Sequence, residues 1–481
     1  MTVRRLFAAL FFIALFAMGV REALDPDMWW HLRTGEIILQ QGIPRQDVFS
    51  FTALDHAWVT HEWLSQVVMW LGYQAGGFPG LIVLFALLIA LSYWLLYLVC
   101  DGRPYLAAFI VLLAAITSAI VWGVRPQIFN LLLSAVFVHV VERVKNGRYV
   151  RRTLWLLPLF MLFWANFHSG YLLGVVLLGT YVVGEAGQQL LDKGDERTLD
   201  WAAIRHLFVV TIVSFLVAVL NPSGTELWIY PFFTLGSSAM QTYIQEWHSP
   251  NFHVALFWPF AAMLAGGAVS FIFSQRRMTA TDLLLFGGTG AAGLVSARNI
   301  PLFAVIATPI IARHTLSALW GTKLYPVLGG EKPEPAPARM MEILNWLLLG
   351  VAVMGVLGWT AAKIDNQTTA VAERYPKLAV DFLEANGLAE AHGYNSYNWG
   401  GYLIWRGLPV FVDGRADVYG DEFLFYYRET FDVKETWREP LDEFAVDYVL
   451  MEKGSPLTTV LAADGWQEIY QDGLAQIFVR P

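Results

Sequence analysis

The segment LIVLFALLIALSYWLLYLV, residues 81–99, decides the fold of this chain, and it contains no Asp, Glu, Lys or Arg. A helix of about 20 apolar residues crosses the roughly 30 Å hydrocarbon core of a bilayer, so the segment predicts a membrane-spanning helix. We therefore expect a mainly α-helical, polytopic membrane bundle of about eleven spans. Ten further segments are similarly apolar, although several are short: residues 6–20, 105–121, 128–141, 154–164, 171–187, 207–220, 255–273, 283–295, 302–311 and 343–360.

The composition of the 481 residues agrees with this prediction. Hydrophobic residues make up 56% and charged residues 15%, against about 25% charged in an average soluble domain. Such high hydrophobicity excludes a disordered chain. The net charge of −8 argues against nucleic acid as the main partner. Cys100 is the single cysteine, which excludes an internal disulfide and a Cys-based zinc site.

The distribution of basic residues predicts the orientation in the cytoplasmic (inner) membrane. A cytoplasmic N-terminus satisfies the positive-inside rule, and an odd number of spans then places the C-terminal tail outside. Residues 1–20 could instead be a cleaved signal peptide, but an uncleaved first span fits a polytopic chain better. The cytoplasmic loops then hold Arg103, Arg143, Lys145, Arg148, Arg151, Arg152, Lys193, Arg197, Arg205, Arg276, Arg277, Arg313, Lys323, Lys332 and Arg339.

Two regions are expected. Residues 1–361 form the transmembrane region, with a long first outside loop at residues 21–80 and a cytoplasmic linker, rich in Pro and charge, at about residues 313–341. Residues 362–481 have ordinary soluble composition and predict a small extracytoplasmic α/β domain. In this domain we expect a helix at residues 375–386 and strands at residues 402–405, 410–412, 448–451 and 476–479.

The first outside loop opens with Asp25-Pro26-Asp27. Two carboxylates two positions apart could face one Mg²⁺ or Mn²⁺ ion, because these hard cations prefer oxygen ligands and keep positions open for substrate phosphate. Alternatively, Asp25 or Asp27 caps a helix running through residues 29–40. Both interpretations can hold together, with one Asp capping and the other catalytic.

Other ionisable and amide residues fall at span ends on the same outer side. Such residues are candidate site contacts because burying them is costly. Arg125 and Arg298 could instead extend to the interface, His61 and Glu62 could belong to an interfacial amphipathic helix, and His168 could be a cap. The candidates are His31, His61, Glu62, Arg125, Asn166, His168, Glu246, Arg298 and Asn299. We expect His168, Glu246 and Arg298 to converge with Asp25 and Asp27 on one outward cavity beneath the C-terminal domain.

The C-terminal tail carries a dense polar and aromatic cluster around Tyr397 and Trp399, followed by Asp413, Arg415 and Asp417. The loop after the apolar run 410–412 could project these charges into a site that contacts an acceptor. It could equally be a structural turn held by an Asp–Arg pair.

Several stretches resemble a family of bacterial GT-C-like membrane proteins: DPDMWWHL (25–32), HEWLSQ (61–66), ARNIPLF (297–303), NWGGYLIW (398–405) and VFVDGRADVYG (410–420). The layout, with one span followed by a long acidic outside loop, also resembles the catalytic subunits of oligosaccharyltransferases. This chain lacks their Trp-Trp-Asp-Tyr-Gly signature, so acceptor recognition does not carry over from them.

The resemblance implies an inverting glycosyltransferase at the outer face, using a sugar on a polyprenyl phosphate or pyrophosphate. Asp25 and Asp27 would act as general base or hold the cation, while Arg298 and Arg125 would neutralise the leaving phosphate. The implied partners are membrane lipid, the lipid-linked donor and a glycan, lipid or protein acceptor. Two alternatives remain: a lipid or polysaccharide transporter (flippase), and a non-catalytic envelope assembly protein.

Overall fold

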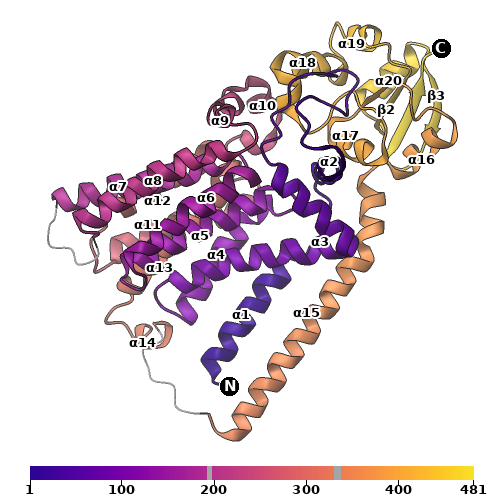
Figure 1. Ribbon diagram of the computed structural model, residues 1–481. Coiled ribbons are helices and arrows are strands. Elements are labelled where there is room, and N and C mark those ends of the chain that lie inside the picture. The colour runs from indigo at the N-terminus through magenta and orange to yellow at the C-terminus, as the bar shows by residue number, and fades with distance from the viewer. Residues whose placement is uncertain (192–197, 330–336) are drawn as a thin grey trace.

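The computed structural model describes residues 1–191, 198–329 and 337–481 (Figure 1). Lys193, Arg197 and Lys332, and with them the middle of the expected linker at residues 313–341, lie outside the described residues. The rest is mainly helical, with one small sheet near the C-terminus. Helices that overlap the eleven expected spans are α1 (Val3–Gly19), α3 (Trp63–Val99), α4 (Tyr105–Ser118), α5 (Gln127–Lys145), α6 (Leu156–Phe167), α7 (Tyr171–Leu191), α8 (Trp201–Val217), α11 (Trp258–Phe273), α12 (Ala280–Val295), α13 (Ile300–Ala318) and α15 (Arg339–Arg374).

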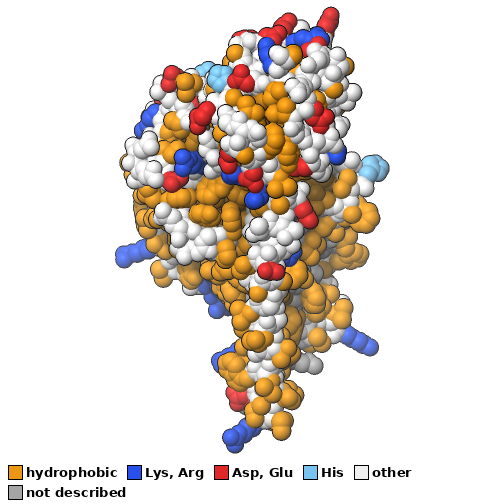
Figure 2. Space-filling view, turned by 90° about the vertical axis from the view of Figure 1, so that its right-hand side faces the viewer, with side chains coloured by type: hydrophobic (Ala, Val, Ile, Leu, Met, Phe, Trp, Pro, Cys, Tyr) orange, Lys and Arg blue, Asp and Glu red, His pale blue; other side chains and the backbone are white. Residues whose placement is uncertain are grey.

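The described residues contain seven segments long and apolar enough to cross a membrane, and two shorter apolar helices, Tyr105–Val121 and Ala280–Val295. The seven are Trp63–Val99, Gln127–Lys145, Tyr171–Leu191, Trp201–Leu220, Ala255–Phe273, Ala297–Ala318 and Arg339–Arg374. The predicted multi-pass helical bundle is therefore confirmed. Figure 2 shows hydrophobic side chains covering the bundle and α15, while acidic and basic side chains gather mainly at the C-terminal end of the molecule.

Shorter helices connect the bundle. They are α2 (Met28–Gln41), α9 (Glu226–Gly236), α10 (Ser238–Tyr243), α14 (Tyr325–Leu328) and the 3-10 turns η1 (Ala119–Val121), η2 (Arg151–Trp155), η3 (Ala218–Leu220), η4 (Gln245–Trp247), η5 (Ala255–Phe257) and η6 (Ala297–Asn299). The first part of α3 belongs to the predicted outside loop. It is separated from the apolar part by a kink at Gly77, where φ is 59° and Pro79 follows two residues later.

The helix α15 stands at the edge of the bundle and leads into the C-terminal domain (Figure 1). Near its C-terminal end, Gln367 exchanges two hydrogen bonds with the backbone of Ala23, of 2.8 and 3.0 Å. Lys363 also pairs with Glu22 at 3.1 Å. The end of the first span and the entry to the C-terminal domain are therefore tied together, directly beside Asp25 and Asp27 in the sequence.

The C-terminal domain contains a four-stranded sheet in the order β1-β2-β4-β3. Strand β1 (Gly393–Asn395) pairs parallel with β2 (Tyr448–Glu452), and β4 (Ala475–Val479) pairs antiparallel with both β2 and β3 (Gln467–Gln471). The accompanying helices are α16 (Lys377–Ala385), α17 (Tyr397–Arg406), α18 (Ala416–Phe431), α19 (Glu439–Glu443) and α20 (Pro456–Ala463). The predicted α/β fold is confirmed, as are the helix near residues 375–386 and the strands near 448–451 and 476–479.

Two predicted strands are wrong. Residues 402–405 lie inside α17, because Tyr402, Leu403 and Ile404 are buried together on one helix, which ends at Gly407 with φ 83°. Residues 410–412 form only a single bridge, Ser50 to Val410, with the first outside loop. These apolar residues are buried against that loop and not in the sheet. They have the composition of a strand, but they form no hydrogen-bonded ladder with a neighbouring strand.

Candidate active site

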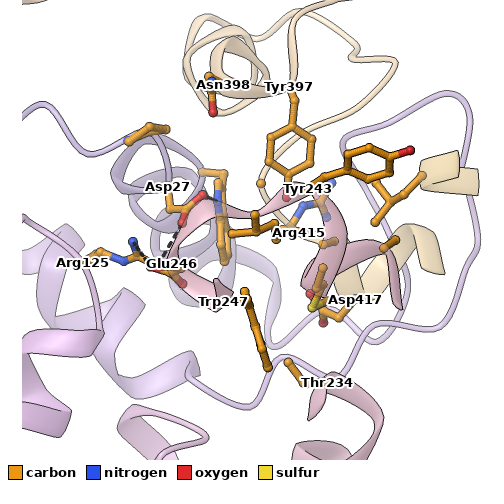
Figure 3. Close-up of a pocket in the computed structure, with 18 of the residues that line it drawn as sticks. Asp27, Arg125, Thr234, Tyr243, Glu246, Trp247, Tyr397, Asn398, Arg415 and Asp417 are labelled. Atoms are coloured by element: carbon orange, nitrogen blue, oxygen red, sulfur yellow. Dashed lines mark hydrogen bonds and ion pairs between the residues drawn. The ribbon is translucent and has the colours of Figure 1, made fainter. Parts of the chain in front are cut away.

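A cavity of about 660 Å³ lies where the helical bundle meets the C-terminal domain (Figure 3). Its walls come from the start of α2, the start of α3, the loop before α5, the segment from α9 to η4, and the residues that begin α17 and α18. Segments far apart in the sequence thus converge on one cavity.

Arg125 lies among three carboxylates at one side of this cavity. Its Nη1 is 3.6 Å from Asp25 Oδ2 and 3.9 Å from Glu246 Oε2, and its Nη2 is 3.4 Å from Asp27 Oδ2. Figure 3 shows Asp27, Arg125 and Glu246 side by side. The four side chains are between 12% and 27% exposed, so solvent or substrate in the cavity can reach them.

A second arginine continues this charged group. Arg298 Nη1 is 3.8 Å from Glu246 Oε1, and its guanidinium lies 4.8 Å from the centre of the Trp247 ring. Glu246 therefore bridges two arginines, and the ring of Trp247 orients one of them.

Hydrogen bonds from neighbouring groups orient the carboxylates of Asp25 and Asp27 toward Arg125. The amide of Asp27 donates to Asp25 Oδ1 at 3.0 Å, and Trp30 Nε1 donates to Asp27 Oδ1 at 3.2 Å. Asp27 occupies the N-cap position of α2, yet its side chain accepts no hydrogen bond from the helix backbone. The interpretation of Asp27 as a side-chain cap of this helix is therefore wrong.

Burial and the neighbouring charges set the protonation of these acids. Burial raises the pKa of Asp25, and it raises the pKa of Asp27 to about 7, with Arg125 opposing the rise and Asp25 adding to it. Burial also acts on Glu246, but Arg125 and Arg298 outweigh it and lower the pKa of that carboxyl. Near neutral pH, Glu246 is ionised and Asp27 is poised between its two forms.

A second acidic position faces the cavity at Glu62. Its carboxylate oxygens lie 3.7 Å from His31 Nδ1 and 3.7 Å from His61 Nε2. Burial raises the pKa of Glu62 to about 8, while burial lowers the pKa values of both histidines. These three groups are therefore mostly uncharged at neutral pH, unlike Glu246.

Most residues predicted from the sequence meet at this cavity. Asp25 does not line the cavity itself but reaches it through its contact with Arg125. The predicted residues that line it are Asp27, His31, His61, Glu62, Arg125, His168, Glu246, Arg298, Tyr397, Arg415 and Asp417.

Four predicted residues lie beside the cavity instead of lining it. Asn166 accepts from Trp63 Nε1 at 2.6 Å, and Asn299 donates to the carbonyl of Ala292 at 3.2 Å. Trp399 donates to the carbonyl of Arg374, and Asp413 is fully buried. The contacts of these side chains hold helix ends and loops.

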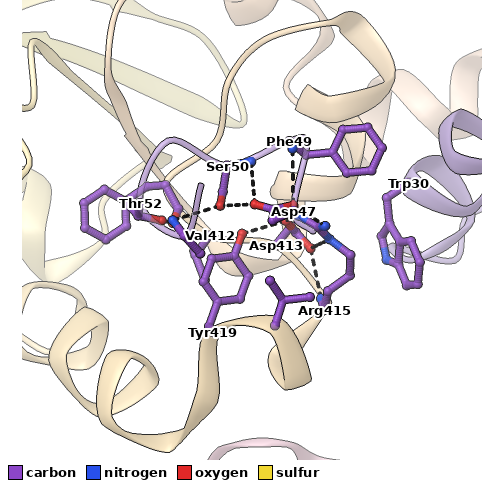
Figure 4. Close-up of polar contacts among 12 residues, drawn as sticks. Trp30, Asp47, Phe49, Ser50, Thr52, Val412, Asp413, Arg415 and Tyr419 are labelled. Atoms are coloured by element: carbon purple, nitrogen blue, oxygen red, sulfur yellow. Dashed lines mark hydrogen bonds and ion pairs between the residues drawn. The ribbon is translucent and has the colours of Figure 1, made fainter. Parts of the chain in front are cut away.

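Arg415 borders the cavity, but its buried side chain belongs to a closed ion-pair network (Figure 4). Its guanidinium bonds to both oxygens of Asp413 and pairs with Asp47 from the first outside loop, and all three side chains are 0% exposed. The same guanidinium lies over the rings of Phe49 and Trp58, at 4.9 and 4.7 Å. The alternative of a structural Asp–Arg pair therefore describes these contacts.

Three cavity residues, Tyr230, Tyr243 and Glu452, were not among the predicted site residues. Tyr230 donates to Asp417 Oδ2 at 3.0 Å, and Tyr243 and Glu452 also line the cavity. Tyr230 and Tyr243 precede Glu246 in the segment from Asn221 to His253, which was predicted to lie outside. The density of aromatic residues in this segment is the signal that could have found them.

The carboxylates of Asp25 and Asp27 do not leave a shared position for the predicted Mg²⁺ or Mn²⁺ ion. Both are turned toward the guanidinium of Arg125. Among the residues that the structure describes, no group of three or more His, Cys, Asp or Glu side chains has the arrangement of a metal site. The residues present therefore do not fit the predicted cation, and we derive no step through it.

Comparison with known proteins identifies the fold. No family model and no curated protein matched the sequence. The archaeal oligosaccharyltransferase AglB from Archaeoglobus fulgidus, solved with an inhibitory peptide and a dolichol-phosphate, superposes with a TM-score of 0.54 over 93% of this chain and 69% of its own, at 11% identity. This chain has a GT-C-like fold. ArnT from Cupriavidus metallidurans, bound to undecaprenyl phosphate, superposes with a TM-score of 0.50 over 98% and 97% of the two chains, at 16% identity.

Proposed function

We propose that this protein is a membrane glycosyltransferase that moves a sugar or glycan from a polyprenyl-phosphate-linked donor to an acceptor at the outer face of the cytoplasmic membrane. The observation that carries the proposal is the convergence of Asp27 and Arg298 on one cavity at the junction of a GT-C-like bundle and its C-terminal domain. The two solved structures with this fold hold dolichol-phosphate and undecaprenyl phosphate, which supports a lipid phosphate as the donor's leaving group.

The proposed reaction is a single displacement. The acceptor oxygen attacks the anomeric carbon of the donor sugar, the bond from that carbon to the phosphate oxygen breaks, and the configuration inverts. Asp27 takes the acceptor's hydroxyl proton, because its pKa of about 7 suits a general base at neutral pH. The polyprenyl phosphate leaves with the electron pair of the broken bond.

Arg298 is the better placed of the two arginines for the leaving phosphate. It contacts one carboxylate, Glu246, whereas Arg125 is shared by three. A guanidinium offers several donors in one plane, which suits phosphate oxygens. The ring of Trp247 keeps the group at the cavity wall.

The opposite wall is suited to an acceptor with hydroxyl groups. Tyr243, Tyr397 and Asp417 lie to the right of Asp27 in Figure 3, and Asn398 lies above Asp27. Aromatic faces next to amide and carboxylate groups bind sugars or peptides, so either a glycan or a protein acceptor fits this wall.

The test is transfer of a labelled sugar from polyprenyl phosphate in membranes that contain the protein. Wild type should transfer, and Asp27→Asn should lower the rate by roughly 10²- to 10⁴-fold, the range expected for loss of a general base. Asp381→Asn is the matched control, because Asp381 on α16 pairs with Lys377 of the same helix and with Arg406 of α17, outside the cavity. Equal rates for wild type and Asp27→Asn would refute the proposed centre.

A further inference from the structure

Three carboxylates from two separate segments share the guanidinium of Arg125. We propose that Arg125 is the resident cation of this site, a side chain that takes the position a divalent metal ion would need between Asp25 and Asp27. The inference rests on the proposed function for its meaning, since it concerns the same catalytic centre. It assigns Arg125 a positioning role and leaves phosphate binding to Arg298.

The distances make a metal ion and this guanidinium mutually exclusive. Mg²⁺ binds oxygen ligands at about 2.0–2.1 Å. The Arg125 nitrogens already lie 3.6 and 3.4 Å from the Oδ2 atoms of Asp25 and Asp27. An ion held by both atoms would occupy the space around the guanidinium and repel its positive charge. Metal binding by Asp25 and Asp27 would thus require Arg125 to move away from both carboxylates.

The local backbone holds the arginine and the carboxylates together. A Cβ at Gly123 would lie 2.8 Å from Asp25 Oδ2, so the absent side chain lets the loop before α5 approach Asp25 closely. Pro126 follows Arg125 and forms the N-cap of α5. The amide of Asp27 fixes the Asp25 carboxylate from the other side. The arrangement therefore comes from two segments that are each constrained locally.

The charges around Arg125 also favour a guanidinium over a metal ion at this position. Glu246 links Arg125 to Arg298 across the cavity wall. A guanidinium stays protonated at every physiological pH, so it balances the carboxylates regardless of how much metal is present. Its charge also opposes the rise in the pKa of Asp27 that burial causes. Arg125 thereby keeps the proposed base ionisable near neutral pH.

The first experiment measures Mn²⁺ binding to the purified full-length protein by electron paramagnetic resonance, and it does not depend on transfer. Wild type should bind no Mn²⁺ at this site. Arg125→Ala should gain one bound Mn²⁺, and adding Asp27→Asn to that variant should remove it. Arg406→Ala is the matched control, because Arg406 also contacts two carboxylates, Asp381 and Glu384, but outside the cavity; it should gain none.

The second experiment measures transfer with a chelator present. Wild-type transfer should be insensitive to EDTA, and Arg125→Ala should lose roughly 10²-fold, with partial rescue by free guanidinium ion. Arg125→Lys keeps the charge, so it should exclude Mn²⁺ and keep more activity than Arg125→Ala. If Arg125→Ala does not fold, Arg125→Gln takes its place, because it removes the charge and keeps most of the side chain's bulk; it should gain the bound Mn²⁺.

Two results would overturn the proposal: one Mn²⁺ bound by wild type and lost in Asp27→Asn, or a folded Arg125→Ala protein that gains no Mn²⁺. If no polyprenyl-phosphate donor supports transfer, the proposed function fails, while the Mn²⁺ measurements still decide the role of Arg125.

Discussion

Two arginines of this protein, Arg125 and Arg415, each contact carboxylates that include a residue of the first outside loop, yet their surroundings differ. Arg415 makes direct hydrogen bonds to Asp413, and the pair is 0% exposed. Arg125 holds its three carboxylates at 3.4–3.9 Å without a hydrogen bond among the described contacts, and it is 21% exposed to the cavity. A closed, fully bonded network stabilises a fold, whereas an open, loosely held one can respond to a substrate.

The first way to test this contrast is to remove the closed network. Arg415→Met leaves Asp47 and Asp413 buried without their partner, which should cost about 3–5 kcal/mol of folding free energy. We expect a large fall in the unfolding temperature in detergent and loss of protein from membranes.

Arg438→Met is the control for this substitution. Arg438 is 57% exposed and pairs with Asp464 on the surface, so its loss should change the unfolding temperature little. Similar unfolding temperatures for the two variants would show that the buried network does not stabilise the junction of the first loop and the C-terminal domain.

The difference between the two arginines also explains what the sequence could and could not predict. Hydropathy identified a helix for every expected span, because membrane helices must be apolar over a fixed length. The Asp25-Pro26-Asp27 motif was found because charges are rare in this chain. Its partner was not assigned, since nothing in the local sequence shows that the loop before α5 folds onto it.

The errors have a related cause. Residues 410–412 have the composition of a strand, but their neighbour is the first outside loop, more than 350 positions away in the sequence. Whether Arg415 acts in the site or behind its wall depends on the same long-range packing. Local pattern thus predicted the elements, and the tertiary contacts decided which charges face the cavity.

The second test removes an arginine of the open group. Arg298→Ala should lower transfer by about 10²-fold, because one donor to the leaving phosphate is lost, while the unfolding temperature changes little. The rate of Arg298→Lys should lie between those of Arg298→Ala and wild type.

Arg480→Ala is a suitable control, since Arg480 bonds to backbone carbonyls of the C-terminal domain outside the cavity. If Arg298→Ala transfers as fast as this control, Arg298 does not contact the phosphate.

The smallest effect we predict is the pH dependence of the open group. Asp27 faces Asp25, Arg125 and Glu246, and burial raises its pKa to about 7. A general base acts in its ionised form, so transfer should rise with pH through about 7, by roughly tenfold between pH 6 and pH 8, and level off above. The dependence of kcat/KM on pH, measured in membranes, tests this directly.

In Arg125→Ala the opposing charge is lost, so the midpoint of this pH profile should move to higher pH, whereas in Arg406→Ala it should stay. A flat profile in wild type would contradict the assignment of Asp27 as the base, and an unmoved midpoint in a folded Arg125→Ala protein would contradict the influence of Arg125 on it.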